Sequence, residues 1–182
     1  MAPVQIWMVA TLRQIKFVSP FMHAPGGWAV CETLHFFGLS LLVGMIGTFD
    51  LRLLGVAKRV PIAVLHKLIP WGIAGYVINV TTGVMFLVTE PDQYIFNPAF
   101  HFKILFMALA GVNVLAFYLT LFGKVKTLGP GADTPRAAKI VGAASLVLWT
   151  AVIVCGRMLT FYRPFNCGPA GAGFLATCFP HG

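Results

Sequence analysis

The sequence predicts an all-α fold, an integral membrane bundle of four transmembrane helices. Of its 182 residues, 58% are hydrophobic and only 10% are charged, whereas soluble domains carry about 25% charged residues. Four charge-poor runs are each close to the ~20 residues that a helix needs to cross a bilayer. These runs are residues 28–49, 68–89, 104–123 and 140–159. Together they predict one transmembrane domain over residues 1–182.

Turn-forming residues separate the four runs. Pro25-Gly26-Gly27 precedes the first run, and Glu90-Pro91-Asp92 ends the second. Asn97-Pro98 is typical of a helix N-cap followed by a first-turn proline, which begins the third helix before its apolar run. Gly129-Pro130-Gly131 lies between the third and fourth runs. Helices are expected throughout, because only helices and closed barrels satisfy the backbone inside a bilayer.

The distribution of positive charge predicts orientation rather than nucleic-acid binding. The formal charge is +8, but the basic residues lie mainly outside the apolar runs, as in membrane proteins. Loops 50–67 and 124–139 hold eight of them, and the other side of the membrane holds Arg13, Lys16, Lys103, Arg157 and Arg163. The positive-inside rule places both loops in the cytoplasm. We therefore expect a bacterial inner-membrane protein with both termini in the periplasm.

The segments outside the bundle carry two further predictions. Residues 4–15 place their apolar side chains on one helical face, which predicts an interfacial helix on the periplasmic side; a short re-entrant segment is the alternative. The C-terminal tail is rich in glycine and proline and contains Cys167 and Cys178 on the oxidising side, which favours a disulfide. Cys31 and Cys155 are an alternative facing pair near the outer ends of the first and fourth helices.

His35 is the first candidate ligand, because ionisable residues inside a membrane are costly and usually functional. It lies seven residues into the first run, and Gly38 on the same face leaves room for a broad cofactor. A hydrogen bond to a neighbouring helix is the alternative. Glu32 and His35 form the E-x-x-H part of a di-iron signature, but the other acids, Asp50 included, fall near span ends or in loops. A di-iron site is therefore not expected.

His101 is the second candidate ligand. It lies in the first turn of the third helix, on the same side of the membrane as His35. Two imidazoles aimed into a helical bundle are the usual ligands of haem b, provided that the helices are offset or the haem is tilted. His101 as a simple interfacial residue is the alternative.

Other polar residues near the bilayer admit both structural and functional interpretations. Lys103 and Arg157, with Arg163, gather at the outer boundary, where they could bind haem propionates, lipid head groups or a quinone carbonyl. Arg157 could also pair with Glu32, because a lone buried charge is unfavourable. Asn79 and Asn113 fall in mid-span, and glycines beside Asn79 favour close helix packing with interhelical hydrogen bonds. A quinone or proton-path role is the alternative.

Several motifs resemble a proteobacterial family of small four-helix inner-membrane proteins of unknown function. They are Glu32-Thr33-Leu34-His35-Phe36-Phe37-Gly38, Asp50-Leu51-Arg52-Leu53-Leu54-Gly55, Pro70-Trp71-Gly72, Asn97-Pro98-Ala99-Phe100 and Lys103. The resemblance covers roughly residues 28–160. The family is similar in general look to the membrane subunits of b-type cytochromes, so the resemblance implies the same fold class.

The leading hypothesis from the sequence is a non-catalytic subunit of a membrane redox complex. It would bind haem b or a quinone in the periplasmic half, with His35 and His101 as ligands and with Arg157, Lys103 and Gly38 beside them. Electrons would pass between a periplasmic partner and the quinone pool. The alternative is a cofactor-free structural or assembly subunit that contacts lipid and other subunits of a membrane complex.

Overall fold

The computed structural model describes residues 3–161, and four long helices make up most of this range. They are α3 (Gly27–Leu54), α5 (Ile69–Thr89), α7 (Pro98–Thr120) and α9 (Arg136–Met158). The shorter helices are α1 (Pro3–Leu12), α2 (Ser19–His23), α4 (Ile62–His66), α6 (Pro91–Ile95) and α8 (Phe122–Val125). Each long helix, with α4 added to α5, is long and apolar enough to cross a membrane. The predicted all-α bundle of four transmembrane helices is confirmed.

Three long helices extend beyond the apolar runs that predicted them. Helix α3 continues to Leu54 rather than stopping at residue 49, so that Asp50 lies inside the helix. Helix α7 begins at Pro98, ahead of its apolar run as the Asn97-Pro98 pair predicted, and α9 begins at Arg136 rather than 140. Hydropathy marks the part of a helix that lies in hydrocarbon, whereas backbone hydrogen bonding continues through the interface. The 28 residues of α3 span about 42 Å, more than the ~30 Å hydrocarbon core.

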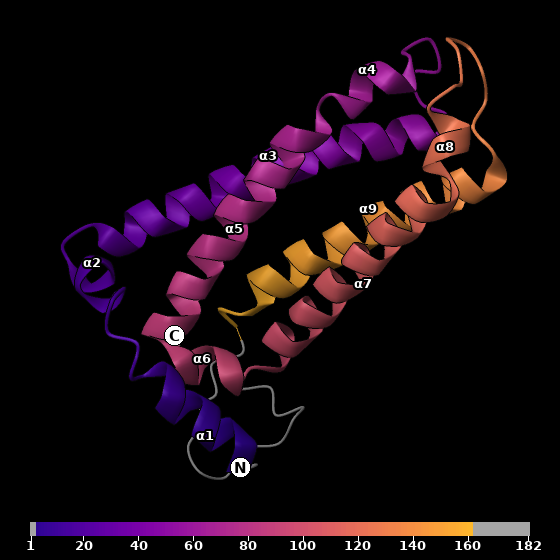
Figure 1. Cartoon of the computed structure of the whole chain (residues 1–182). Coiled ribbons are helices and arrows are strands. Elements are labelled where there is room, and N and C mark those ends of the chain that lie inside the picture. The colour runs from indigo at the N-terminus through magenta and orange to yellow at the C-terminus, as the bar shows by residue number, and fades with distance from the viewer. Residues whose placement is uncertain (1–2, 162–182) are drawn as a thin grey trace.

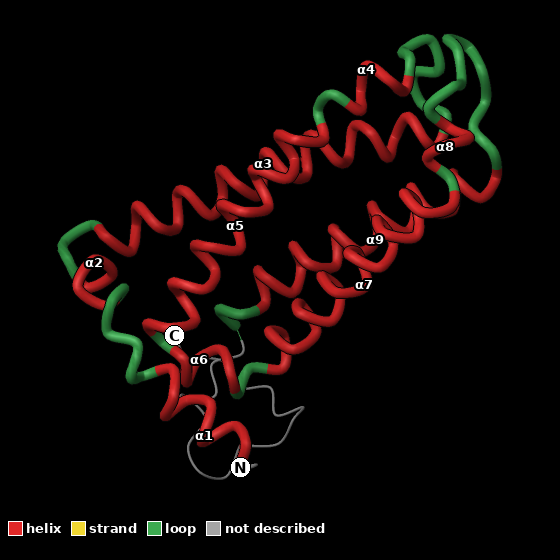
Figure 2. Tube along the Cα trace, in the orientation of Figure 1, coloured by secondary structure: helices red, strands yellow, loops and turns green. Residues whose placement is uncertain are grey.

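The four long helices form two packed pairs. Helix α3 packs along α5, and α7 packs along α9. The pairs are joined where α3 contacts α9, while α5 and α7 have no comparable contact with each other. Figure 1 shows α5 and α7 in different helix pairs, joined through α6 at the end of the bundle opposite α8. Figure 2 shows that loops and short helices are confined to the two ends of the long helices.

Glycines allow α3 and α5 to touch backbone to backbone. A Cβ added to Gly38 would lie 2.8 Å from the Gly75 carbonyl oxygen, and a Cβ added to Gly75 would lie 2.6 Å from the Gly38 carbonyl oxygen. Close approach through small residues is the usual way in which membrane helices gain packing contacts, since lipid provides no hydrophobic drive between helices. The small-residue face predicted for the second span is confirmed.

One end of the bundle, here called the basic end, holds the α3–α4 loop (residues 55–61) and the α8–α9 loop (residues 126–135). Arg52 is 1% exposed and joins these two loops. Its Nε donates to the Val60 carbonyl at 2.8 Å, and its Nη2 donates to the carbonyls of Lys58 at 3.1 Å and Ala132 at 3.3 Å. Arg52 therefore holds the two loops together. It is not an exposed charge, although it was counted among the basic residues of this end when the orientation was predicted.

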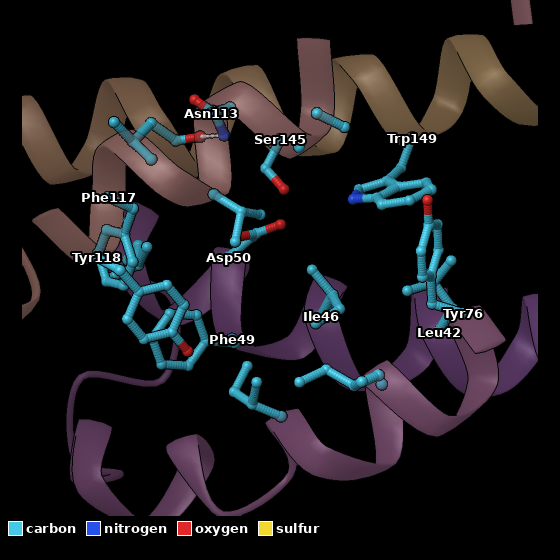
Figure 3. A pocket seen from close by; sticks show the side chains of 18 of the residues that line it. Leu42, Ile46, Phe49, Asp50, Tyr76, Asn113, Phe117, Tyr118, Ser145 and Trp149 are labelled. Carbon is cyan, nitrogen blue, oxygen red and sulfur yellow. Dashed lines mark hydrogen bonds between the residues drawn. The ribbon is translucent and has the colours of Figure 1, made fainter. Parts of the chain in front are cut away.

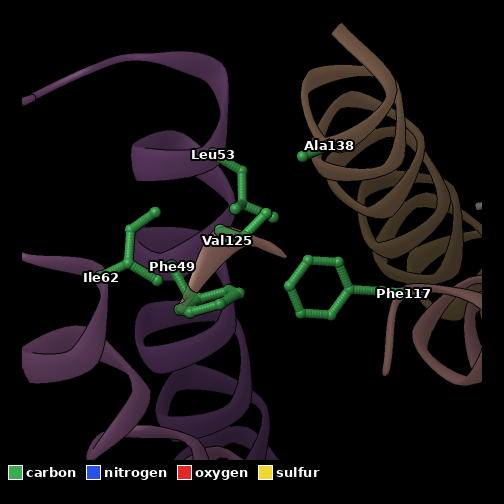
Figure 4. Packing of buried hydrophobic residues seen from close by; sticks show 6 residues of the cluster. All are labelled: Phe49, Leu53, Ile62, Phe117, Val125 and Ala138. Carbon is green, nitrogen blue, oxygen red and sulfur yellow. The ribbon is translucent and has the colours of Figure 1, made fainter. Parts of the chain in front are cut away.

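Apolar side chains from five helices meet just inside the basic end. Figure 4 shows Phe49 and Leu53 of α3 packed with Ile62 of α4, and Phe117 of α7 beside them. Val125 of α8 and Ala138 of α9 complete the cluster. All six side chains are less than 5% exposed. The cluster holds the two helix pairs together at this end.

An exposed ion triad also connects the basic-end loops. Asp133 lies 3.1 Å from the Lys58 Nζ and 2.7 Å from the Lys139 Nζ. Hydrogen bonds from these two lysines lower the pKa of Asp133 from its ordinary value of 3.8 to about 2. Because the folded pKa is depressed, this contribution to stability is present above pH 3.8 and is lost as the pH falls through about 2. Solvent exposure keeps the contribution small.

The opposite end, here called the α1 end, carries α1, α2 and α6. Helix α1 lies against α6, where Gln5 donates to the Ile95 carbonyl at 3.3 Å and Arg13 forms an ion pair with Asp92. Val4 and Trp7 remain 63% and 67% exposed. A helix over residues 3–12 with exposed apolar side chains is the form expected of a segment that lies on a membrane surface. The C-terminal tail, with Arg163, Cys167 and Cys178, lies outside the described residues.

Replacing Gly75 by alanine tests the glycine contact between α3 and α5. The added methyl group meets backbone atoms that cannot move aside, so we expect a loss of about 1–3 kcal/mol in stability, the range for overpacking. Gly44→Ala is the matched control, because nothing lies within 4 Å of a Cβ at that position. Thermal unfolding in mild detergent measures both variants. Equal melting temperatures for the two variants would contradict the close contact.

Replacing Arg52 by methionine tests the connection between the basic-end loops. The variant removes three hydrogen bonds from a charged donor to buried carbonyls, and we expect it to lower stability by roughly 2–4 kcal/mol. Arg59→Met changes an exposed arginine of the same loop and should leave the melting temperature almost unchanged. The account of Arg52 is wrong if both substitutions have the same small effect.

Candidate functional site

His35, the main candidate of the sequence, is half-buried between α3 and α5. Its Nδ1 lies 2.8 Å from the Thr82 Oγ1, and its backbone carbonyl accepts a hydrogen bond from the Asn79 Nδ2 at 3.0 Å. The ring packs edge-on to Phe86, with 5.6 Å between ring centroids. The interhelical hydrogen bonds that the sequence left open as alternatives for His35 and Asn79 are therefore present.

Thr82 is placed to orient the His35 ring. The Thr82 Oγ1 lies 2.8 Å from the Ile78 carbonyl and 3.1 Å from the Asn79 carbonyl. When the hydroxyl donates to one of these carbonyls, its oxygen accepts from the His35 Nδ1–H. In that tautomer the His35 Nε2 has a free lone pair. Metal-bound histidines are commonly oriented by a hydrogen bond at the other ring nitrogen in this way.

His101 is placed differently from His35. It is exposed at the start of α7, and its Nε2 lies 2.8 Å from the Ile95 carbonyl of α6. This hydrogen bond ties α6 to α7, as expected of an interfacial residue. The ring contact recorded for His101 is with its neighbour Phe100. Within residues 3–161, no cluster of three or more His, Cys, Asp or Glu side chains forms a metal site.

The other predicted site residues are distributed around the α1 end. The space beside Gly38 is filled by the α5 backbone, so it does not hold room for a cofactor. The Lys103 Nζ lies beside Gly156 of α9 and within electrostatic range of His35. Arg157 is exposed and stacks its guanidinium over the Phe161 ring at 5.4 Å. The structure therefore brings Lys103 toward His35 and leaves Arg157 at the surface.

Two pairings suggested by the sequence are absent from the described residues. Glu32 is exposed, and no ion pair joins it to Arg157. Cys31 and Cys155 are both free thiols. Cys31 is buried with its sulfur 3.8 Å from the Thr82 carbonyl, whereas Cys155 lies near Lys103. The alternative of a facing cysteine pair is wrong because the two residues contact different helices.

A cavity in the half of the bundle nearest the basic end was not anticipated. It has a volume of about 240 Å³ and is lined by all four long helices. Most lining side chains are aliphatic or aromatic, including Phe49, Tyr76 and Phe117. Figure 3 shows Asp50, Ser145 and Trp149 directed into this space. We call it the α5–α7 cavity, because these two helices form its opposite walls.

Two polar groups in the cavity have no hydrogen-bond partner. They are the Asp50 Oδ2 and the Trp149 Nε1, both of which are buried. Asp50 is 5% exposed, and its carboxyl is hydrogen-bonded to the Ser145 side chain, which leaves the Oδ2 without a partner. Each buried and unsatisfied polar group costs about 1–3 kcal/mol. Each such group needs a partner that the described residues do not supply, such as a water molecule or a ligand.

Glycines and an amide position these polar groups. A Cβ on Gly142 would lie 3.0 Å from the Asp50 carbonyl oxygen, so α9 approaches α3 closely at this level. The Asn113 Nδ2 donates to the Val141 carbonyl at 3.1 Å and joins α7 to α9. Ser145 and Trp149 then face the cavity one helical turn apart. The predicted interhelical role of Asn113 is confirmed, and Asn113 also lines the cavity.

The mouth of the cavity lies between α5 and α7. Ile73 and Tyr76 on α5 line the cavity and are 56% and 38% exposed. Val114 and Tyr118 on α7 also line it and are each 38% exposed. Because both helices cross the membrane, the exposed surface at this level faces lipid. A ligand can therefore enter sideways from the bilayer.

The sequence contained a signal for this site that hydropathy concealed. Leu42, Ile46, Phe49, Asp50 and Leu53 all line the cavity, and their spacing is that of one helical face. Asp50 was assigned to a span end because the apolar run stops at residue 49. Continuing the helical face of the first run would have placed this carboxyl inside the bundle.

Comparison with known protein families, characterised proteins and solved structures found no match to this chain.

Proposed function

We propose that this chain is the quinone-binding membrane subunit of a redox complex, with the quinone headgroup in the α5–α7 cavity. The observation that carries the proposal is the pair of unpartnered polar atoms, the Asp50 Oδ2 and the Trp149 Nε1, beside an apolar space open to lipid. This deepens the sequence hypothesis of haem b or quinone binding. It also moves the quinone to the half of the bundle nearest the basic end.

The chemistry of the cavity favours a ligand with carbonyl acceptors. The Trp149 Nε1–H is a donor without an acceptor. No Lys, Arg or His lines the cavity, so a charged Asp50 would lack a counter-ion. A lone carboxylate is costly inside a membrane, which favours the protonated acid, a second donor. A quinone offers one carbonyl oxygen to each donor.

The size and lining of the cavity suit the headgroup rather than the whole molecule. A volume of about 240 Å³ is slightly below the ~300 Å³ lower limit of sites for drug-sized ligands. The flat quinone ring can stack against the aromatic walls, while the isoprenoid tail stays in the bilayer beyond Ile73 and Val114. An organic cation could pair with Asp50, but it would leave the Trp149 donor unsatisfied.

Haem b bound through His35 is the second candidate. It is favoured by the lone pair that the Nδ1–H tautomer leaves free on the His35 Nε2. With His101 bonded to Ile95, that residue would have to release α6 before serving as the other ligand. A reduced-minus-oxidised visible spectrum tests the candidate. A b-type band that is lost in His35→Ala would support it, and a featureless spectrum of folded protein would remove it.

The orientation and partners complete the proposal. With Arg52 excluded, seven basic residues remain at the basic end, and the positive-inside rule places this end in the cytoplasm and the N-terminus in the periplasm. The chain has little mass outside the membrane, so its electrons would come from or pass to another subunit. If no quinone binds, the alternative that remains is a structural subunit without a cofactor.

Quinone affinity measured in detergent by calorimetry, with decylubiquinone as the probe, tests the proposal. Trp149→Phe keeps an aromatic ring but removes the donor, so we expect about tenfold weaker binding, equal to the ~1.4 kcal/mol of one hydrogen bond. Trp71→Phe is the control, because Trp71 is 61% exposed and does not line the cavity. Decylubiquinone binding that does not saturate, measured on folded protein, would contradict the proposal.

A second variant narrows the cavity without touching the polar groups. Gly111 lines the cavity, and nothing lies within 4 Å of a Cβ at that position. Because Gly111 is also exposed, Gly111→Leu should narrow the cavity at its α7 wall, leave the melting temperature nearly unchanged and weaken quinone binding. Wild-type affinity in this variant would place the quinone elsewhere.

A further inference from the structure

A histidine at the basic end is hydrogen-bonded to a tyrosine of the cavity wall. The His66 Nε2 lies 3.1 Å from the Tyr118 hydroxyl. His66 is the last residue of α4 and is half-buried, and the next residue, Lys67, is exposed. Tyr118 belongs to α7 and lines the α5–α7 cavity. The pair therefore joins the polar edge of the membrane to the interior of the bundle.

Aromatic rings hold this pair in place. The His66 ring stacks on Phe122 with 4.6 Å between centroids and an interplanar angle of 31°. It also contacts the rings of Phe49 and Tyr118 at 6.3 Å and 6.0 Å. These apolar neighbours leave the Tyr118 hydroxyl as the hydrogen-bonding partner recorded for the His66 side chain.

Tyr118 has a unique position among the cavity side chains that carry an exchangeable proton. The others are Asp50, Tyr76, Asn113, Ser145 and Trp149. Within residues 3–161, Tyr118 alone of this set is hydrogen-bonded to a titratable side chain outside the cavity. Figure 3 shows Asp50 lying between Tyr118 and Trp149 as the cavity is viewed.

We infer that His66 and Tyr118 form a proton relay between the basic end and the Asp50 carboxyl. His66 donates its Nε2 proton to the Tyr118 oxygen as Tyr118 releases its hydroxyl proton to water in the cavity. The water passes a proton to the Asp50 carboxylate, and His66 regains one from solvent. Each relay group ends with its original proton count, and one proton has moved from solvent to Asp50.

The relay needs water in the cavity to join the Tyr118 hydroxyl, which Figure 3 shows at the end of its ring away from Asp50, to the Asp50 carboxyl. The cavity volume of about 240 Å³ exceeds the ~15 Å³ that one water molecule requires, and a water also requires polar partners. The Asp50 carboxyl, the Ser145 hydroxyl and the Asn113 amide supply polar partners. The inference goes beyond quinone binding, because it holds for the empty cavity and for any ligand that exchanges protons with Asp50.

Hydrogen–deuterium exchange followed by infrared spectroscopy tests the relay in the full chain without quinone. The carbonyl band of a protonated carboxylic acid that disappears in Asp50→Asn identifies the Asp50 signal. After transfer to D₂O, this band shifts at the rate at which protons reach Asp50. We expect Tyr118→Phe and His66→Gln each to slow the shift at least tenfold. Tyr76→Phe, the other phenol of the cavity, should exchange like the wild type.

The outcomes separate the relay from the proposed function. Exchange at the wild-type rate in both Tyr118→Phe and His66→Gln would overturn the relay, as would slowing by Tyr76→Phe to the same degree. Using two relay variants on different helices guards against loss of folding in one of them. Since the probe is solvent deuterium, failure of quinone binding leaves this test intact, and failure of the relay leaves the calorimetric test intact.

Discussion

The close contact of α3 with two different helices determines the architecture of this bundle. Glycines make both contacts possible, with Gly38 and Gly75 bringing α3 against α5, and Gly142 bringing α9 against the backbone at Asp50. Because α3 is shared, α5 and α7 each pack on a separate partner and have no comparable contact with one another. The α5–α7 cavity is the consequence of this arrangement. Close backbone contact of α3 with α5 and α9 thus leaves a space between α5 and α7.

Burying Asp50 beside that opening has an energetic cost. An unpaired carboxyl inside a membrane is unfavourable unless it is neutral or acquires a partner, and the unpartnered Trp149 donor adds to the cost. Arg52, two residues further along α3, does not relieve it, since its hydrogen bonds go to loop carbonyls at the basic end. A ligand that satisfies both cavity groups would recover this free energy on binding.

Hydropathy and turn residues were sufficient to predict the four spans, because lipid solvation acts on long stretches of sequence. The N-cap at Asn97 was also predictable, because Asn followed by Pro is typical of a helix start. The structure confirms it: the Asn97 side-chain oxygen accepts from the Ala99 N–H at 3.0 Å. The site was not predictable in the same way. His35 and His101 share a side of the membrane, but the side-chain directions that bond them to Thr82 and Ile95 depend on tertiary contacts. Asp50 was missed because a charged residue ends an apolar run without ending a helix.

The central claim is that a lipid-soluble quinone enters the cavity between α5 and α7. Photolabelling in native-like membranes tests this claim most directly. An azido-quinone is activated in proteoliposomes, and the labelled peptides are mapped by mass spectrometry. The account predicts label on α5 and α7 near Tyr76 and Tyr118, competed by excess unlabelled quinone and reduced in Gly111→Leu. Label spread over the lipid-facing surface, without competition and unchanged in that variant, would contradict it.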